Sequence, residues 1–135
     1  MNRQFLRIVD ANLNRSREGL RVCEEIARFV LEDAHLTGEL KNIRHRITRS
    51  IKKIPGAGDA LLESRESRAD VGKGISGKSL RKLPCEVFSA NIQRVKESLR
   101  VLEELARVFN QSLSRQFSRM RFKVYELEKR IVARL

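Results

Sequence analysis

An asparagine, an arginine and a glutamate recur at the same spacing in two parts of the sequence, and these residue types can recognise an anionic small molecule. The two sets are Asn12, Arg15 and Glu18, and Asn91, Arg94 and Glu97. A guanidinium group binds phosphate or carboxylate oxygens through paired, charge-assisted hydrogen bonds. Residues three apart share one face of a helix, so each set would project in one direction. The pattern predicts an anion site in which both sets take part.

Both sets lie on the side of their helices that also carries the apolar residues. On a helical wheel, Asn12 and Arg15 fall within this inner face, where a polar group is costly unless it has a partner. Gly19 and its counterpart Ser98 are small where a core helix normally carries bulk. These residues predict a polar cavity entered by both helices. The structural alternative is that Glu18 satisfies Arg15 and that Asn12 fixes the helix register.

Two further arginines, Arg44 and Arg121, lie beside the apolar stripes of their own predicted helices. If these two converge with Arg15 and Arg94, the four arginines form a cluster that can bind phosphate or carboxylate groups. The opposite side of the first helix carries charges spaced for pairing along the helix, which indicates a solvated face. These residues are Arg17, Arg21, Glu24, Glu25 and Arg28.

The elements that must position these residues come from an internal duplication. Residues 10–29 and 89–108 are identical at eleven of twenty aligned positions, and a weaker likeness relates 36–54 to 113–131. Apolar residues recur at helical spacing in these segments, so each copy predicts two antiparallel helices. The predicted helices span 5–32, 36–53, 84–110 and 113–133.

We predict an all-α fold: a four-helix bundle made from a duplicated antiparallel helix hairpin, with a long inter-repeat loop. The 135 residues are expected to form a single domain, 1–135. Its parts are the first repeat at 5–54, the loop segment at 55–83 and the second repeat at 84–133. A short helix is expected near 59–67. A loop of this length in a compact domain is usually functional or disordered.

Asp70 lies in a basic, glycine-flanked part of this loop and is a candidate Mg²⁺ ligand or proton acceptor. The structural alternative is a turn or helix-cap aspartate. Residues 72–79 also satisfy the P-loop pattern GxxxxGK(S/T). The residues before them cannot form the buried strand that a P-loop follows, and Pro84 stops the helix that should come next. We therefore expect no P-loop fold, although a loop rich in glycine and lysine can still contact phosphates.

Composition narrows the class of protein. Lys and Arg number 29 against 17 Asp and Glu, so the formal net charge of +12 indicates anionic partners. An apolar share of 41% is too high for a disordered chain, and no apolar run is long enough to cross a membrane. The N-terminus lacks the apolar stretch of a secretory signal, and Cys23 and Cys85 are not spaced as metal ligands. We expect a cytoplasmic protein with reduced thiols and no membrane partner.

The run at 7–29, RIVDANLNRSREGLRVCEEIARF, resembles a small helical domain of bacterial thiamin biosynthesis. That family is regarded as a hydroxymethylpyrimidine phosphate kinase and is often fused in front of thiamin-phosphate synthase. The resemblance covers nearly the whole chain. It continues at Arg44 with His45, at Arg65 with 70–72, along 91–104 and at 125–129. The Gly77-Lys78-Ser79 end of the loop departs from the family pattern.

The resemblance implies ATP- and Mg²⁺-dependent phosphorylation of 4-amino-5-hydroxymethyl-2-methylpyrimidine phosphate to the diphosphate, with ATP as co-substrate. It implies that Glu18 and Glu97 orient arginines or hold Mg²⁺, and that Asp70 is the catalytic base or a Mg²⁺ ligand. The residues implied to bind the phosphates and the pyrimidine are Asn12, Arg15, Arg44, His45, Arg65, Gly72, Asn91, Arg94 and Arg121.

The implied partners are a small-molecule phosphate, a nucleotide and thiamin-phosphate synthase. The sequence leaves the oligomeric state open, with a homodimer as one alternative. No synthase sequence follows Leu135, so a free-standing domain or a piece of a longer chain is expected.

Three other interpretations stay open on the residues alone. A basic helical module could bind nucleic acid with a steep salt dependence, although inward-facing arginines and scarce aromatic residues argue against this. A helical enzyme or binder for a small carboxylate or phosphorylated compound, similar to chorismate mutase, would need neither ATP nor Mg²⁺. A bundle that only docks partners would lose stability and nothing else when Arg15 or Arg94 is truncated.

Overall fold

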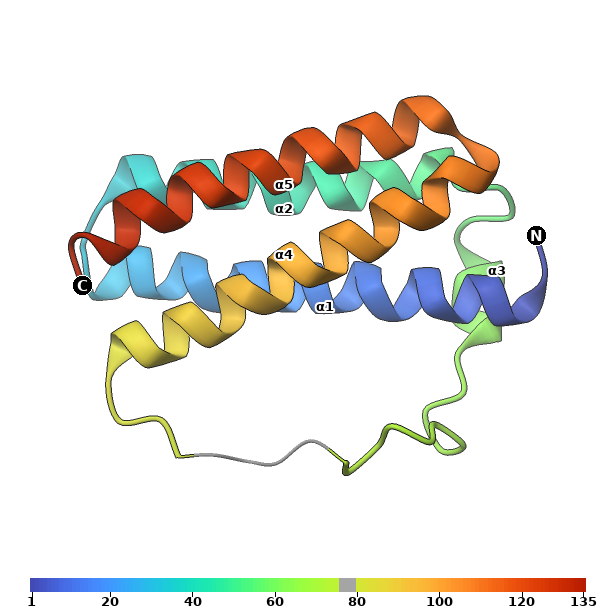
Figure 1. The fold of residues 1–135 in the computed structure, drawn as a ribbon, viewed down its shortest axis with the longest axis horizontal. Helices are drawn as coiled ribbons and strands as arrows, with labels where there is room; N and C mark the ends of the chain where they lie inside the picture. The colour runs from blue at the N-terminus through green and yellow to red at the C-terminus, as the bar shows by residue number, and fades with distance from the viewer. Residues whose placement is uncertain (76–79) are drawn as a thin grey trace.

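The computed structural model describes residues 1–75 and 80–135 and consists of helices joined by turns and one long connection (Figure 1). The helices are α1 (Arg3–Phe29), α2 (Ala34–Ser50), α3 (Asp59–Ser64), α4 (Pro84–Phe109) and α5 (Gln111–Val132), and a 3-10 turn (Ile51–Lys53) extends α2. The described residues contain no strand. The predicted all-α fold is confirmed, and all four predicted long helices are present.

The two hairpins close in the same way, as expected for a duplicated sequence. The Asp33 side chain accepts a hydrogen bond from the backbone N–H of Leu36 at 2.8 Å, and that of Asn110 accepts one from Leu113 at 3.0 Å. Asp33 and Asn110 are aligned positions of the two repeats. Each cap satisfies an N–H group in the first turn of the following helix, which has no partner within the helix. The caps start α2 and α5 two residues earlier than predicted.

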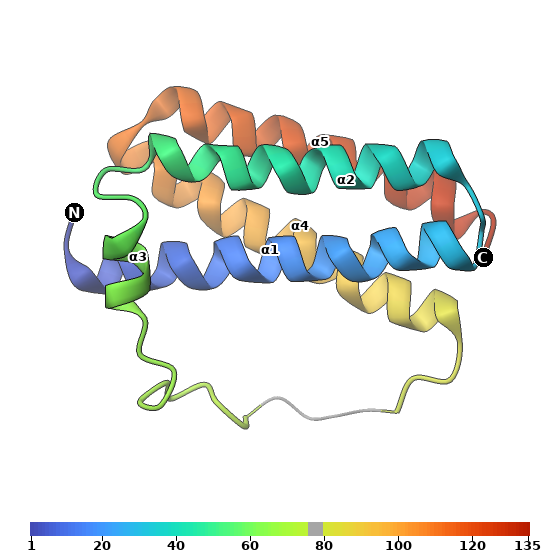
Figure 2. The same ribbon diagram turned by 180° about the vertical axis from the view of Figure 1, so that it is seen from behind.

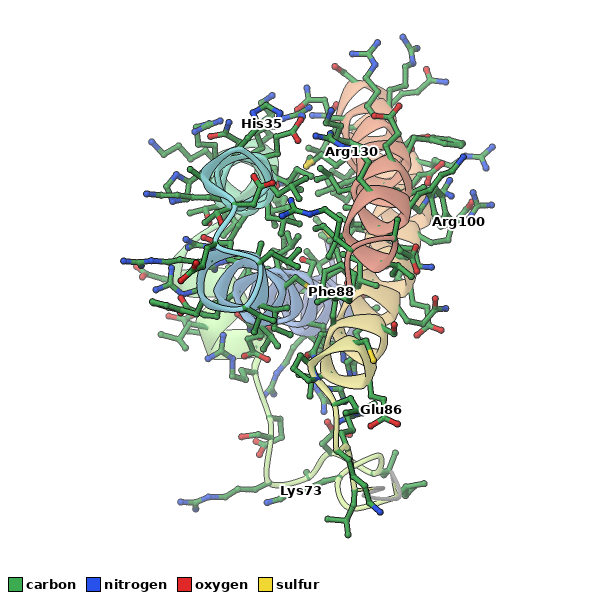
Figure 3. The ribbon with its side chains drawn as sticks, turned by 90° about the vertical axis from the view of Figure 1, so that its left-hand side faces the viewer. His35, Lys73, Glu86, Phe88, Arg100 and Arg130 are labelled. Atoms are coloured by element: carbon green, nitrogen blue, oxygen red, sulfur yellow. The ribbon has the colours of Figure 1, made fainter. Side chains whose placement is uncertain are left out.

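The hairpins pack together through α1 and α4, which run in opposite directions. Phe5 near the start of α1 makes an edge-to-face contact with Phe109 at the end of α4, with ring centroids 6.4 Å apart. The sulfur of Cys23 lies 3.9 Å from the carbonyl oxygen of Phe88 near the start of α4. α2 and α5 lie side by side, and α3 packs against α1 (Figures 1 and 2). Phe88 is fully buried in the core, whereas Arg100 is exposed (Figure 3).

Gly19 marks a close approach between the two hairpins. A Cβ atom at this position would lie 2.8 Å from Val95 Cγ2 and 3.0 Å from the carbonyl oxygen of Asn91. The space beside Gly19 is therefore filled by α4, and the polar cavity that we expected there was a wrong prediction. Ser98 is also buried, and its hydroxyl donates to the carbonyl oxygen of Val95 at 3.0 Å. Small residues at these aligned positions serve helix packing.

Cys23 and Cys85 should differ strongly in reactivity because only one of them is fully buried. Burial, together with the negative charges of Glu128 and Glu24, raises the pKa of the Cys23 thiol to about 12. Cys85 is half-buried near the start of α4. We expect iodoacetamide at mildly alkaline pH to alkylate Cys85 alone in the native protein, and both thiols in denaturant, as counted by intact-mass spectrometry. Labelling of both thiols at equal rates in the native protein would contradict this packing.

The connection between α3 and α4 lies on the side of the molecule away from α2 and α5. Its described parts, 65–75 and 80–83, run outside α1 and α4 (Figures 1 and 2). α3 ends at Ser64, and the described residues before Gly72 form bends and turns, so they do not form the strand that precedes a P-loop. Positions 76–79 of that pattern lie outside the described residues. Within the described ranges, no helix is both long and apolar enough to span a bilayer.

Candidate functional site

A cleft of about 740 Å³ opens between the first half of α1 and residues 65–70, which follow α3. It brings together five of the predicted site residues, namely Asn12, Arg15, Glu18, Arg65 and Asp70. The first three come from α1 and the other two from the connection. Other polar residues that line it are Gln4, Arg7, Asp10, Asn14, Glu66 and Ser67. The cleft therefore contains cationic, anionic and amide groups from two distant parts of the sequence.

An ion pair between Asp10 and Arg65 joins the two walls of the cleft. Arg65 Nε lies 2.8 Å from Asp10 Oδ2, and Arg65 Nη2 lies 2.9 Å from Oδ1, so the guanidinium donates two hydrogen bonds to the carboxylate. The Asp10 side chain is 11% exposed. The hydrogen bond that Arg65 donates to Asp10 raises the pKa of Arg65. The sequence analysis did not single out Asp10. A signal was available, because Asp10 aligns with Ser89, so the two repeats differ at this position although neighbouring aligned positions match.

Arg15 has a different environment from Arg65. It is exposed in the cleft, and no carboxylate in the described part of the chain pairs with it. Arg7, two turns earlier on α1, donates to the carbonyl oxygen of Glu66 at 3.5 Å. Asn12 is buried, and its Nδ2 donates to the carbonyl oxygen of Ile8 at 2.8 Å. The guanidinium of Arg15 is therefore the cationic group most available to an incoming oxyanion.

Two exposed carboxylates, Glu18 and Asp70, line the same cleft. Asp70 Oδ1 accepts a hydrogen bond from the backbone N–H of Gly72 at 2.9 Å, so Asp70 is also a turn residue. Gly72 itself does not line the cleft. The described residues hold no group of three or more His, Cys, Asp or Glu side chains arranged to bind a metal. The Mg²⁺ role expected of Asp70, Glu18 and Glu97 stays a prediction.

The equivalent residues of the second repeat do not join this cleft. Asn91 donates to the backbone of its own helix at 2.8 Å, and Arg94 is exposed on α4. Glu97 accepts a hydrogen bond from Gln93 Nε2 at 3.0 Å. Glu97 lines a separate hollow of about 430 Å³, together with Arg121. The expected convergence of the two sets is therefore not seen, and only the first set meets the connection after α3.

Arg44 and Arg121 are held by carboxylates from a neighbouring helix. Arg44 Nη2 lies 3.1 Å from Glu24 Oε1, and Arg121 Nε lies 3.0 Å from Glu103 Oε2. The hydrogen bond that Arg44 donates to Glu24 raises the pKa of Arg44. These equivalent pairs tie α2 to α1 and α5 to α4. Glu24, which we expected on a solvated face, is only 3% exposed. His45 is exposed on α2 and does not line the cleft.

Removing the Glu24 carboxylate should cost far more stability than removing that of its neighbour Glu25. Glu24→Ala leaves the Arg44 side chain, which is 20% exposed, without its partner, and losing one member of a buried pair costs about 3 kcal/mol. Glu25 is 40% exposed and pairs with Arg21 at 3.4 Å, so Glu25→Ala should cost about 0.5 kcal/mol. Urea unfolding of both variants measures the difference. Equal losses would contradict the buried role of Glu24.

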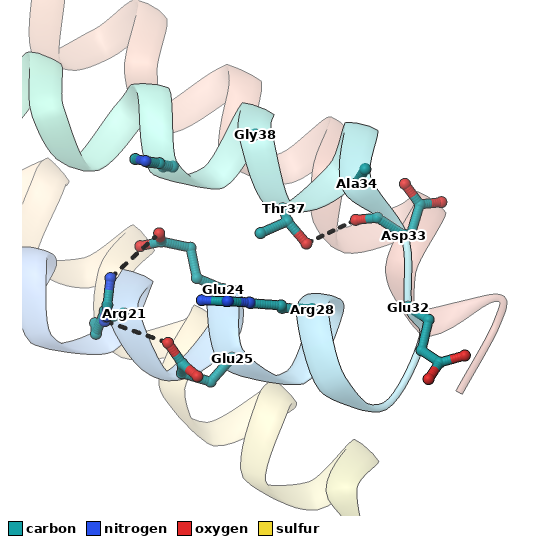
Figure 4. A pocket seen from close by; sticks show the side chains of 10 residues that line it. Arg21, Glu24, Glu25, Arg28, Glu32, Asp33, Ala34, Thr37 and Gly38 are labelled. Carbon is teal, nitrogen blue, oxygen red and sulfur yellow. Dashed lines mark hydrogen bonds and ion pairs between the residues drawn. The ribbon is translucent and has the colours of Figure 1, made fainter.

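A second large hollow, of about 650 Å³, lies where α1 and α2 meet at their hairpin turn (Figure 4). Three of its charged groups pair with one another, since Arg21 lies 3.8 Å from Glu24 and 3.4 Å from Glu25. Thr37 donates to the backbone carbonyl of Asp33 at 2.6 Å. None of the residues that we predicted for the site lines this hollow. The cleft beside Arg15 is therefore the candidate site.

Comparison with known proteins gives consistent matches along most of the chain. A family model described as "ThiD2 family" matches residues 7–130. The thiamine-phosphate synthase of one strain of Prochlorococcus marinus is 37% identical over 123 residues, covering 90% of this chain and 34% of that protein. Those of Thermosynechococcus vestitus and of Synechocystis sp. are 40% and 39% identical over 124 residues. The chain spans about a third of the length of these curated relatives. No solved structure shows significant similarity.

These findings correct one expectation and support another. The relatives are named thiamine-phosphate synthase and not kinase, so the predicted phosphorylation of hydroxymethylpyrimidine phosphate is wrong, and ATP has no support as a co-substrate. The broader expectation, a helical domain related to thiamine biosynthesis, is confirmed.

Proposed function

Because the chain belongs to the ThiD2 family, we propose that it serves thiamine biosynthesis by binding a phosphorylated small molecule in the cleft beside Arg15. The observation that carries this proposal is the guanidinium of Arg15, which pairs with no described carboxylate in a cleft where Arg65 is already bound to Asp10. Such a guanidinium can bind phosphate without first giving up a carboxylate. The cleft volume of about 740 Å³ is also in the range common for small-molecule sites.

The mixture of charges in the cleft favours a ligand that carries both signs. Arg7 and Arg15 supply positive groups, and Glu18 and Asp70 supply exposed carboxylates. Thiamine phosphate, the product in the name of the relatives, combines a phosphate monoester with a positively charged ring and an aromatic amine. We expect its phosphate to contact Arg15 and its cationic or amino groups to face the carboxylates. A phosphorylated precursor with an amino-substituted ring belongs to the same ligand class.

The proposed role is recognition of the phosphorylated compound. The curated relatives are much longer than the part that this chain matches, so their full activity is not assigned to this chain. We propose that the domain works with a thiamine-phosphate synthase, either in one polypeptide or as a separate partner. Asp10 acts as a positioning residue in this account, because it holds Arg65, and with it the segment 65–70, against α1.

Isothermal titration with thiamine phosphate and with unphosphorylated thiamine tests this function. The two compounds differ only in the phosphate group, and one charge-assisted contact contributes roughly 1.5–3 kcal/mol. We therefore expect thiamine phosphate to bind at least about tenfold more tightly than thiamine. Equal affinities would contradict recognition through phosphate. The absence of binding by either compound, with the protein shown to be folded by circular dichroism, would overturn the proposal.

A further inference from the structure

The positive charge of the chain is concentrated in two short stretches. Residues 40–58 contain six Lys and Arg, and residues 105–125 contain five, while neither stretch contains an Asp or a Glu. Together they hold eleven positive charges, against a net charge of +12 for the whole chain. The remainder of the sequence is therefore almost neutral. A local excess of one sign raises the local concentration of counter-ions much more than the same charge spread over the surface.

The fold brings the two stretches side by side. The second half of α2, with its 3-10 extension, lies next to the first half of α5, on the side of the molecule away from residues 65–75 (Figures 1 and 2). Lys53 Nζ donates to Gln116 Oε1 at 2.9 Å, so the end of the 3-10 extension lies beside α5. Farther along, Glu39 of α2 pairs with Lys123 and Arg130 of α5. The carboxylate of Glu39 thus lies toward one end of the contact between α2 and α5. Most of the basic residues of α2 and its extension that pair with no described carboxylate lie toward the other end.

A groove of about 180 Å³ opens in this basic region between α2 and α5. Three cations line it, Arg46, Arg49 and Lys53, with Gln116 on the opposite wall. The three cations share one face of α2 and its extension, at successive turns. None of them forms an ion pair with any carboxylate that the structure describes. No described carboxylate lines this groove, in contrast to the hollows of 740, 650 and 430 Å³ described above.

We infer that this groove is a second anion site, separate from the cleft beside Arg15, and that it binds a compact multivalent oxyanion such as a phosphate or diphosphate group. Three cations that line one groove repel one another, and an anion bound between them relieves this repulsion while accepting charge-assisted hydrogen bonds. The groove is small, so it suits an inorganic or terminal phosphate group better than a whole heterocyclic ligand. The amide of Gln116 can supply a further polar contact.

Isothermal titration of pyrophosphate into the full chain, in salt of about 150 mM, tests the inference with a charge-matched control. The groove variant is Arg46→Gln with Arg49→Gln. The control is Lys41→Gln with Lys52→Gln, which removes the same charge from α2 and its extension at residues that do not line the groove. We expect pyrophosphate binding to weaken at least about tenfold in the groove variant and no more than about twofold in the control.

Three outcomes would overturn the inference. If both double variants weaken binding equally, the protein attracts pyrophosphate only through its net charge. If Arg15→Gln abolishes pyrophosphate binding and the groove variant does not, the anion belongs to the candidate site. If a single-stranded oligonucleotide binds more tightly than pyrophosphate, with an affinity that falls steeply with salt, the surface serves a nucleic acid. The two sites use different residues. If the groove does not bind an anion, the proposed function of the cleft beside Arg15 is unaffected, and if that function fails, the groove proposal is unaffected.

Discussion

Replacing Gly19 with valine is expected to lower the free energy of unfolding by about 3 kcal/mol, because the added side chain has no space between α1 and α4. Even a Cβ atom would lie 2.8 Å from Val95 Cγ2 and 3.0 Å from the carbonyl oxygen of Asn91. The second of these atoms belongs to the backbone of α4, so relief requires the two hairpins to move apart. That movement would disturb the apolar contacts along the whole interface. Urea unfolding followed by circular dichroism measures the loss.

Gly38 provides a control position for this prediction. It also lies inside a helix, α2, but a Cβ atom there would meet nothing within 4 Å. Gly38→Ala should therefore raise the free energy of unfolding by about 0.5–1 kcal/mol, through helix propensity and a less flexible unfolded chain. A Gly19→Val variant as stable as the wild-type protein would show that α1 and α4 do not approach each other as the structure shows.

Arg15→Gln is expected to weaken thiamine phosphate binding by about tenfold to a hundredfold, since it removes the charge proposed to contact the phosphate. Glutamine keeps a polar, flexible side chain of similar reach, so loss of packing should be small. Arg15 is exposed and pairs with no described carboxylate, so the free energy of unfolding should change by less than about 0.5 kcal/mol. Isothermal titration gives the affinity, and urea unfolding gives the stability.

Arg94→Gln is the natural control because Arg94 occupies the aligned position in the second repeat. It is also exposed on its helix, but it does not line the cleft. The variant removes the same charge from an equivalent helix, so we expect its affinity for thiamine phosphate to stay within about twofold of wild type. Equal weakening by Arg15→Gln and Arg94→Gln would mean that the ligand responds to net charge, or that both repeats contribute to one site.

The duplication made most of the fold predictable from the sequence. Two copies with the same apolar spacing predicted four long helices, and the structure has them at the predicted places within about three residues. The ends were displaced where side chains cap the helices. Asp33 and Asn110 start α2 and α5 two residues before the predicted starts. Apolar periodicity does not report these caps, because a cap depends on one polar side chain and not on a repeated pattern.

The candidate site was predicted only in part, because a helical wheel shows which residues share a face but not which element covers that face. Asn12 and Arg15 were placed together with their counterparts in a shared cavity. The structure shows that α1 approaches α4 closely at Gly19, so the second set stays outside the cleft. The wall opposite Arg15 comes instead from the connection after α3. No repeat or period in the sequence indicates where that connection folds back.

The buried carboxylates were harder to predict than the arginines. Glu24 lies on the polar side of α1 and was expected to be solvated, but it is buried and pairs with Arg44 of α2. α1 contacts both α2 and α4, so its buried arc is wider than its apolar stripe. The repetition of the pair as Glu103 with Arg121 could have revealed it, since both members are matched in the two repeats.

The most direct test of the account is an NMR titration that locates the ligand along the chain. Thiamine phosphate added to ¹⁵N-labelled protein should shift the backbone amides of residues 7–18 and 65–72, which form the two walls of the cleft and the adjoining turn. The aligned residues 86–97 of the second repeat should not shift. Shifts centred on 86–97 or on the α2 and α5 groove, with residues 7–18 unchanged at saturating ligand, would contradict the account.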